Sequence, residues 1–219
     1  MSVVGRPQTL LSMNPLVVVV DEVFDADLAK HIIAKGDGVF QRGAVVNASG
    51  GSKISESRTN ENARVDQWAD PRVTELVSEI SSLVRLPPEN TEPCKLLRYQ
   101  GEQKFDAHSD AFDQSPGGRQ FLAEGGQRLF TTICYLNDVE EGGETEFPHL
   151  KIKVKPKLGR VLIFGNTRLG TATPHPHSLH AGRSVVNGEK FAMSIWWRQL
   201  AYHIQRDYPE ETGETQVIA

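Results

Sequence analysis

The spacing of apolar and polar side chains changes along the chain, and its N-terminal part contains two segments with helical periodicity. In both segments apolar residues recur at every third or fourth position, as on the buried face of a helix. The first segment begins at Asp25 and runs to about Lys35. The second has Asp70 as its expected N-cap, Pro71 in its first turn and Pro87-Pro88 beyond its end. The pattern therefore predicts two helices.

Shorter apolar or alternating runs, separated by turn residues, predict strands. Leu16–Val20 is a β-branched run that indicates a buried strand. Segment 42–62 is rich in Gly, Ser and Asn and predicts a hairpin with a mobile loop at 48–52. Asn187-Gly188 is typical of a hairpin turn, because both residues tolerate a positive φ. The other predicted strands are 95–99, 129–136, 151–154, 160–164 and 191–197.

Two helices followed by many short strands predict an α+β fold that is mainly β. We expect a double-stranded β-helix, or jelly-roll, barrel with the N-terminal helices packed on its outer face. The expected arrangement is a single domain over 1–204, with helical support at about 14–90 and the barrel core at about 92–200. The tail at 205–219 is acidic and poor in apolar residues, so we expect it to be disordered.

Composition narrows the expected partners and location. The chain has 219 residues, of which 38% are hydrophobic and 24% charged, as in ordinary globular proteins. Its formal net charge of -4 gives no basic patch, so no nucleic-acid partner is expected. Cys94 and Cys134 lie in apolar runs and are expected to be reduced core thiols. No signal-peptide pattern or membrane-spanning run is found, so we expect a cytoplasmic protein without a membrane partner.

Three polar residues resemble the ligands of a mononuclear iron site. His108 and Asp110 are two positions apart, and His180 follows far downstream. If the first two lie on an extended strand, their side chains point to the same side and reach one ion. Two imidazoles and a carboxylate on one face of a metal leave its opposite face open, as in non-haem Fe(II) oxygenases. The pattern alone is weak, because the chain has seven histidines.

Lys190 follows the Asn187-Gly188 turn. On an alternating strand it shares one face with Ala192 and Ser194, while Phe191 and its alternate neighbours face apolar partners. A lysine directed into a barrel needs an anionic partner, because burying an unpaired ammonium is costly. The alternative is a surface lysine at a hairpin tip.

From about Glu92 to Trp197, the chain resembles the catalytic domain of the prolyl 4-hydroxylase family of Fe(II)/2-oxoglutarate dioxygenases. The similar segments follow one another in the family's order and include both parts of the proposed iron site. They are Tyr99-Gln100-Gly101, Phe105-Asp106-Ala107-His108-Ser109-Asp110, Gly126-Gln127-Arg128, Thr131, Tyr135-Leu136-Asn137, Gly142-Gly143-Glu144-Thr145-Glu146-Phe147-Pro148, Pro156, Gly159, Phe164, Ser178-Leu179-His180-Ala181-Gly182 and Gly188-Glu189-Lys190.

The resemblance assigns roles to these residues. His108, Asp110 and His180 would bind Fe(II), and Lys190 would pair with the distal carboxylate of 2-oxoglutarate. Tyr99 and Thr145 would form hydrogen bonds with the same cosubstrate. The implied reaction couples decarboxylation of 2-oxoglutarate by O2, giving succinate and CO2, to C–H hydroxylation of a peptidyl proline. The resemblance also implies that ascorbate sustains activity by reducing the iron again.

The substrate assignment is more open than the cofactor assignment. Arg58, Arg128 and Phe105 are the candidate substrate-binding residues, and the loop at about 47–53 is expected to close over a bound peptide. This chain has Phe105 and Ser178 where peptidyl-proline hydroxylases of this type usually have Tyr and often Trp. A hydroxylase of a free amino acid or other small metabolite is therefore an alternative, and a jelly-roll module that binds a metal or sugar is the non-enzymatic one.

Several other polar and aromatic residues have simpler interpretations. Glu144 is expected in a turn or behind the ligands, and His175 and His177 are expected to face solvent or the site mouth without binding metal. Trp196 and Trp197 are expected to pack in the barrel wall. Segment 113–125 resembles an insertion and is expected to form part of the substrate mouth.

Overall fold

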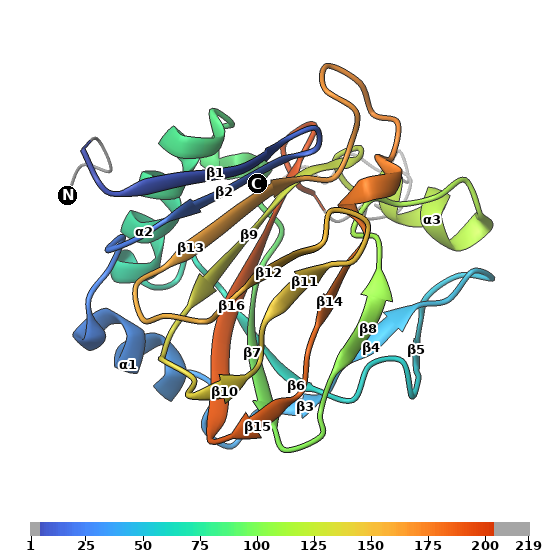
Figure 1. Cartoon of the computed structure of the whole chain (residues 1–219). Helices are drawn as coiled ribbons and strands as arrows, with labels where there is room; N and C mark the ends of the chain where they lie inside the picture. The colour runs from blue at the N-terminus through green and yellow to red at the C-terminus, as the bar shows by residue number, and fades with distance from the viewer. Residues whose placement is uncertain (1–4, 204–219) are drawn as a thin grey trace, which may run out of the picture.

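A computed structural model describes residues 5–203, and it contains two sheets that face each other with helices outside the larger one (Figure 1). The eight-stranded sheet has the order β1-β2-β13-β9-β16-β7-β6-β3. Its strands are β1 Gln8–Met13, β2 Leu16–Val20, β3 Gln41–Arg42, β6 Glu61–Val65, β7 Cys94–Gln100, β9 Arg128–Tyr135, β13 Val161–Gly165 and β16 Glu189–Arg198.

A four-stranded sheet with the order β12-β11-β14-β8 covers the inner face of the larger sheet. Two small antiparallel pairs, β4–β5 and β10–β15, lie beside it. The strands are β8 Phe105–His108, β11 Thr145–Phe147, β12 Ile152–Val154, β14 His180–Gly182, β4 Ala44–Val46, β5 Ser52–Ile54, β10 Glu141–Gly142 and β15 Val185–Asn187. The two facing sheets confirm the predicted jelly-roll fold.

Both predicted helices pack on the outer face of the large sheet. They are α1 Ala26–Ala34 and α2 Pro71–Val84, and their apolar stripes share a core with one face of the sheet strands. Asp70 accepts hydrogen bonds from the first backbone N–H groups of α2, as an N-cap should. The α3 helix, Pro116–Leu122, and the short 3-10 turns η1 Pro88–Asn90 and η2 Pro176–Ser178 complete the elements.

Alternation along β16 separates the two cores. Met193, Ile195 and Trp197 pack against the helices, while Ala192 belongs to the apolar cluster between the two sheets. Lys190 points to the same inner side as Ala192, as the alternating pattern predicts. The strand therefore carries one long cation into the barrel because its register is fixed by the apolar residues on the opposite face.

The N-terminal part is more than a helical support. Four of its strands, β1, β2, β3 and β6, belong to the eight-stranded sheet, and β2 pairs directly with β13 of the barrel core.

The segment at 113–125 contains the helix α3, which the sequence does not predict because two adjacent glycines lie within it. The tail expected to be disordered at 205–219 lies outside the described residues.

Cys94 and Cys134 are buried and unpaired, as expected of core thiols. Across residues 5–203, none of the helices has both the length and the apolar character needed to cross a membrane.

Candidate metal centre

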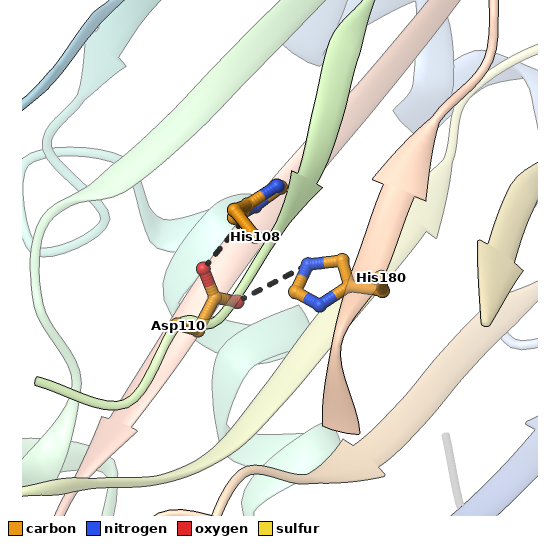
Figure 2. Close-up of side chains that lie close together, drawn as sticks. All are labelled: His108, Asp110 and His180. Atoms are coloured by element: carbon orange, nitrogen blue, oxygen red, sulfur yellow. Dashed lines mark ion pairs between the residues drawn. The ribbon is translucent and has the colours of Figure 1, made fainter. Parts of the chain in front are cut away.

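The three predicted metal ligands meet at the pairing of two strands of the small sheet. His108 ends β8 and lies directly opposite His180, which begins β14. Figure 2 shows Asp110 in the loop after β8, with its carboxylate between the two imidazoles. The expectation that Asp110 lies on the same extended strand as His108 is wrong, since β8 has ended before it. The strand register brings the histidines together, and the turn after β8 places the carboxylate.

The ligand atoms converge on one point. Asp110 Oδ1 lies 3.7 Å from His108 Nε2, and Asp110 Oδ2 lies 3.6 Å from His180 Nε2. One ligand atom from each residue lies within 4.8 Å of the others. Among residues 5–203, no other group of three His, Cys, Asp or Glu side chains meets this condition.

Backbone carbonyls fix the orientation of both imidazoles. His108 Nδ1 lies 2.8 Å from the carbonyl oxygen of Asp106, and His180 Nδ1 lies 3.0 Å from that of Ser178. A carbonyl only accepts, so each Nδ1 carries the proton and donates it. The lone pair of each neutral ring is therefore on Nε2, which faces Asp110. This is the tautomer that a histidine needs to bind a metal through Nε2.

A buried hydrogen-bond chain holds the carboxylate. Thr131 Oγ1 donates to Asp110 Oδ2 at 2.6 Å, and Asn166 Nδ2 donates to Thr131 Oγ1 at 2.8 Å. Burial by itself raises the pKa of Asp110, but the two imidazoles, Arg128 and the Thr131 hydrogen bond bring the pKa below its usual value. Asp110 is therefore ionised at neutral pH.

The donor set fits a divalent metal such as ferrous iron. Burial, reinforced by the neighbouring His180, lowers the pKa of His108 to about 3, so its ring is neutral and available as a ligand at neutral pH. Two imidazoles and an ionised carboxylate, all approaching from one side, match the facial arrangement of non-haem iron sites. Phe105 stacks on the outer face of the His108 ring, with 3.5 Å between the ring centroids.

The predicted cosubstrate residues line the same pocket as the triad. Lys190 is almost fully buried, and its Nζ donates to the carbonyl oxygen of Gly143 at 2.7 Å. Within the described part of the chain, no carboxylate lies within 4.0 Å of this ammonium. Burial lowers the pKa of Lys190 to about 7, and the charge of Glu144 partly opposes that shift. The pocket thus holds a lysine whose charge has no direct counter-ion.

Tyr99 and Thr145 lie beside this lysine. The Tyr99 ring centroid is 4.8 Å from Lys190 Nζ, and the Thr145 hydroxyl accepts a hydrogen bond of 2.8 Å from Tyr135. Since Thr145 accepts that bond, its own hydrogen is left to donate into the pocket. Gly182 makes room for Tyr99, because a Cβ at Gly182 would stand 2.9 Å from the Tyr99 hydroxyl.

A wider groove of about 870 Å³ leads from the triad to the surface. All three candidate substrate residues line it. Arg58 is buried, with its guanidinium 4.5 Å above the Phe105 ring and hydrogen bonds to Asn60 and the Ala44 carbonyl. Arg128 donates two hydrogen bonds to Glu92, so its charge is already paired. The expected insertion at 113–125 reaches the same groove through Phe121 and Glu124.

The structure also places three neighbouring residues, and the expectation for His175 is corrected. His175 is buried, and its Nε2 lies 3.0 Å from Asn14 Oδ1, so this residue holds a loop in place and does not face solvent. Ser178 is fully buried and donates to the carbonyl of His175, so its side chain lines neither the pocket nor the groove. Trp196 lines both, whereas Trp197 packs in the core as expected.

The sequence alone assigns no role to Thr131, Asn166 or Lys95. Thr131 was part of the family resemblance, and the alternation of Thr131, Ile133 and Tyr135 along β9 carries the signal that it faces inward. Asn166 follows β13 and reaches Thr131 only because β13 and β9 are paired. Lys95 lies on the inner face of β7, two positions before Leu97, and lines the groove.

Comparison with known proteins agrees with the fold. The family model described as the 2OG-Fe(II) oxygenase superfamily matches residues 94–198, which include all three ligands and Lys190. In the structure of the viral collagen prolyl hydroxylase of Paramecium Bursaria Chlorella virus-1 with 2OG, the similar chain is 27% identical, with a TM-score of 0.62. The alignment covers 83% of this chain and 95% of the viral one.

Two prolyl 4-hydroxylases of Arabidopsis thaliana identify the family within this superfamily. Prolyl 4-hydroxylase 2 is 36% identical over 198 residues, which are 80% of this chain and 64% of the relative. Prolyl 4-hydroxylase 5 is 31% identical over 208 residues, covering 86% of this chain and 70% of the relative. The chain therefore belongs to the prolyl 4-hydroxylase family of Fe(II)/2-oxoglutarate dioxygenases. It spans less than two thirds of the length of several curated relatives, including the first of these two.

Proposed function

We propose that this protein is an Fe(II)- and 2-oxoglutarate-dependent hydroxylase that acts on a proline within a peptide or protein. The observation that carries the proposal is the combination of the triad and Lys190 in one buried pocket. A metal-binding or sugar-binding module has no need of a buried ammonium whose only hydrogen-bonding partner in the described structure is a carbonyl. A dicarboxylate cosubstrate that reaches from the metal to this lysine does need it.

Different residues of the pocket would bind the metal and the cosubstrate. His108, Asp110 and His180 would hold the ferrous ion from one side, and Thr131 would keep the Asp110 carboxylate in place. When bound, the iron with 2-oxoglutarate and O2 supplies the oxidant for C–H hydroxylation, releasing succinate and CO2. Lys190 would bind the distal carboxylate of 2-oxoglutarate, with hydrogen bonds from Tyr99 and Thr145.

The groove supports a peptide substrate over a free amino acid. It extends from Phe105 and Arg58 beside the triad to β4, β6 and α3, which is more length than a single amino acid needs. Apolar side chains such as Phe105, Phe112 and Trp196 line it together with basic ones. A peptide would bind across this surface with its reacting residue directed at the open side of the metal.

We further propose that ascorbate sustains turnover and that the protein works in a reducing compartment such as the cytoplasm. Ferrous iron must stay reduced between turnovers, and the two buried cysteines are compatible with reducing conditions because they form no disulfide.

The test is substrate-stimulated succinate formation by the purified protein with Fe(II), 2-oxoglutarate, ascorbate and O2. Proline-containing peptides, free proline and other free amino acids are compared, and mass spectrometry locates the added oxygen atom. We expect hydroxylated proline in peptides, with no product from the His180→Ala variant and a raised 2-oxoglutarate requirement for Lys190→Met. Product only from free amino acids would instead establish the small-molecule alternative.

A further inference from the structure

Three basic side chains in the wall of the groove have no acidic side chain in direct contact among residues 5–203. Arg58, Arg64 and Lys95 all line it, and within residues 5–203 none of them has a carboxylate oxygen within 4.0 Å. Arg128 differs, because Glu92 neutralises it. The three unpaired cations come from neighbouring parts of the fold, since Arg64 and Lys95 lie opposite each other in the β6–β7 pairing.

The carboxylates of the groove are already engaged. Glu92 pairs with Arg128 and Arg198, Glu124 lies 3.7 Å from Arg198, and Asp106 pairs with Lys104. Asp110 belongs to the triad. The groove is lined by four cationic and four acidic side chains, but each acidic side chain is engaged with another group, so within residues 5–203 Arg58, Arg64 and Lys95 are left without a direct counter-charge.

Arg58 lies nearer the metal but is buried and bonded to Asn60 and the Ala44 carbonyl, so Lys95 is the next cation along the groove that a substrate can contact. It points to the inner face of β7, and Leu97, the next residue on that face, lines the triad pocket. Residues two apart on a strand are separated by about 7 Å. Lys95 Nζ also lies 5.7 Å from the centroid of Trp196, which lines both the pocket and the groove.

The surroundings of Lys95 disfavour its positive charge. Burial and the charges of Arg58, Arg128 and Arg64 together lower the pKa of Lys95 to about 8, and the charge of Glu92 partly opposes that shift. A half-buried ammonium among other cations is stabilised by any anion that enters the groove. The same anion would be within reach of the exposed guanidinium of Arg64.

We propose that this groove selects substrates with an acidic side chain about two residues from the hydroxylated position, and that Lys95 binds that carboxylate with Arg64. The inference rests on the proposed hydroxylase function and names its substrate class: an acidic peptide. An extended peptide also places alternate side chains about 7 Å apart. This spacing matches the distance along β7 between Leu97, which lines the pocket, and Lys95, which lines the groove.

The test uses a set of peptides with one central proline and a single Glu, moved through the three positions on either side. Each peptide has a partner in which Gln replaces the Glu, and kcat/KM for hydroxylation is compared within each pair. For wild-type protein we expect kcat/KM to be about tenfold higher for the Glu peptide than for its Gln partner when this residue lies about two positions from the proline. This is the effect expected of one charge-assisted hydrogen bond.

Variants of the groove test whether Lys95 causes the preference for Glu over Gln. Lys95→Met should reduce the ratio to near one, and Lys95→Glu should favour peptides with Lys at the same position. Lys153→Met is the matched control, because Lys153 lies on β12 with a largely exposed side chain and should keep the wild-type ratio. The ratio is measured within each variant, so a general loss of activity does not affect it.

Binding provides a second measurement that needs no turnover. Fluorescence anisotropy of the labelled Glu and Gln peptides with Mn(II)-loaded protein should show the same preference and its loss in Lys95→Met. Equal kcat/KM for every Glu and Gln pair, with proline still hydroxylated, would overturn this inference and leave the proposed function intact. Failure to hydroxylate any proline peptide would overturn the proposed function, and equal binding of the paired peptides would then overturn the inference as well.

Discussion

At the scale of single residues, the site depends on side chains whose hydrogen bonds leave one group free. Both histidines donate through Nδ1 and thereby keep Nε2 for a metal. Thr145 accepts from Tyr135 and keeps its hydrogen for a ligand. Lys190 has one carbonyl partner and keeps its remaining hydrogens for an anion.

Cosubstrate affinity should fall as the pH rises above 7. Burial lowers the pKa of Lys190 to about 7 in the free protein, so its ammonium is lost as the pH passes that value. A bound carboxylate favours the charged form, so each pH unit above 7 should weaken 2-oxoglutarate binding by up to about tenfold. Calorimetric titration of Mn(II)-loaded protein between pH 7 and pH 9 measures this. Lys190→Met should bind weakly with no such slope, and a pH-independent affinity in wild-type protein would contradict the prediction.

Removing the Thr131 hydroxyl should weaken the metal site without unfolding the protein. Thr131→Val keeps the side-chain shape but takes away the hydrogen bond to Asp110 and the acceptor for Asn166. Loss of such a supporting partner typically costs about 10–100-fold in metal affinity, and anaerobic Fe(II) titration measures it. Thr132→Val is the control, because Thr132 is also buried but bonds to Trp197 on the other face of β9. Equal Fe(II) affinity in both variants would show that Asp110 needs no such support.

At the scale of elements, the loop expected to be mobile is held against a helix. In the turn of the β4–β5 hairpin, the Ala48 carbonyl accepts from the Gly117 N–H at 2.9 Å, and the Gly51 N–H donates to Gln120 Oε1 at 3.2 Å. Both partners belong to α3, which also borders the groove. Closure of the hairpin over a substrate stays a prediction, and if it occurs these contacts with α3 must move with it or break.

Gly117→Ala should release the hairpin turn. A Cβ at Gly117 would stand 2.0 Å from the backbone oxygen of Asn47, so one of the two elements must move. We expect faster amide hydrogen exchange across residues 47–51 and a lower rate of peptide hydroxylation. Gly165→Ala is the control, since the nearest atom to its Cβ would be at an ordinary 3.7 Å. Unchanged exchange in Gly117→Ala would mean that the hairpin is not held by α3 in solution.

At the scale of the whole molecule, one carboxylate joins three parts of the fold. Glu92 precedes β7, accepts two hydrogen bonds from Arg128 of β9, and lies 3.0 Å from Nε of Arg198 at the end of β16. Arg198 is fully buried and also donates to the carbonyl oxygens of Gly126 and Phe121 after and within α3. This ion cluster closes one end of the large sheet beside the groove.

Glu92→Gln should destabilise the protein strongly. It leaves the buried guanidinium groups of Arg128 and Arg198 without their shared counter-charge, and breaking a buried ion pair from one side costs about 3–5 kcal/mol. The free energy of unfolding from urea titration measures the loss. Glu56→Gln is the control: this carboxylate also pairs with an arginine, but its side chain is 87% exposed, so its loss should cost about 0–1 kcal/mol. Equal effects would show that the Glu92 cluster is no stronger than a surface pair.

The local sequence determined much of this protein. The helical periodicity and the Asp70 cap predicted α2, because those features act within one turn of the chain. Alternation along β16 predicted that Lys190 faces inward with Ala192, because the pleat of a strand has a fixed period of two. The family resemblance then selected His108, Asp110 and His180 from the other histidines and carboxylates.

Only the tertiary structure decided which distant groups meet. Arg128 is paired with Glu92 although the sequence indicates a residue free to bind substrate, and His175 packs against Asn14 although its position between two prolines predicts exposure. Likewise, Lys95 is a candidate for binding substrate only because the neighbouring carboxylates pair with other arginines and lysines. Which side chains pair and which are buried depends on strand order and register, because these bring together segments that are far apart in the chain. Periodicity within one segment therefore does not predict the pairing or burial of its side chains.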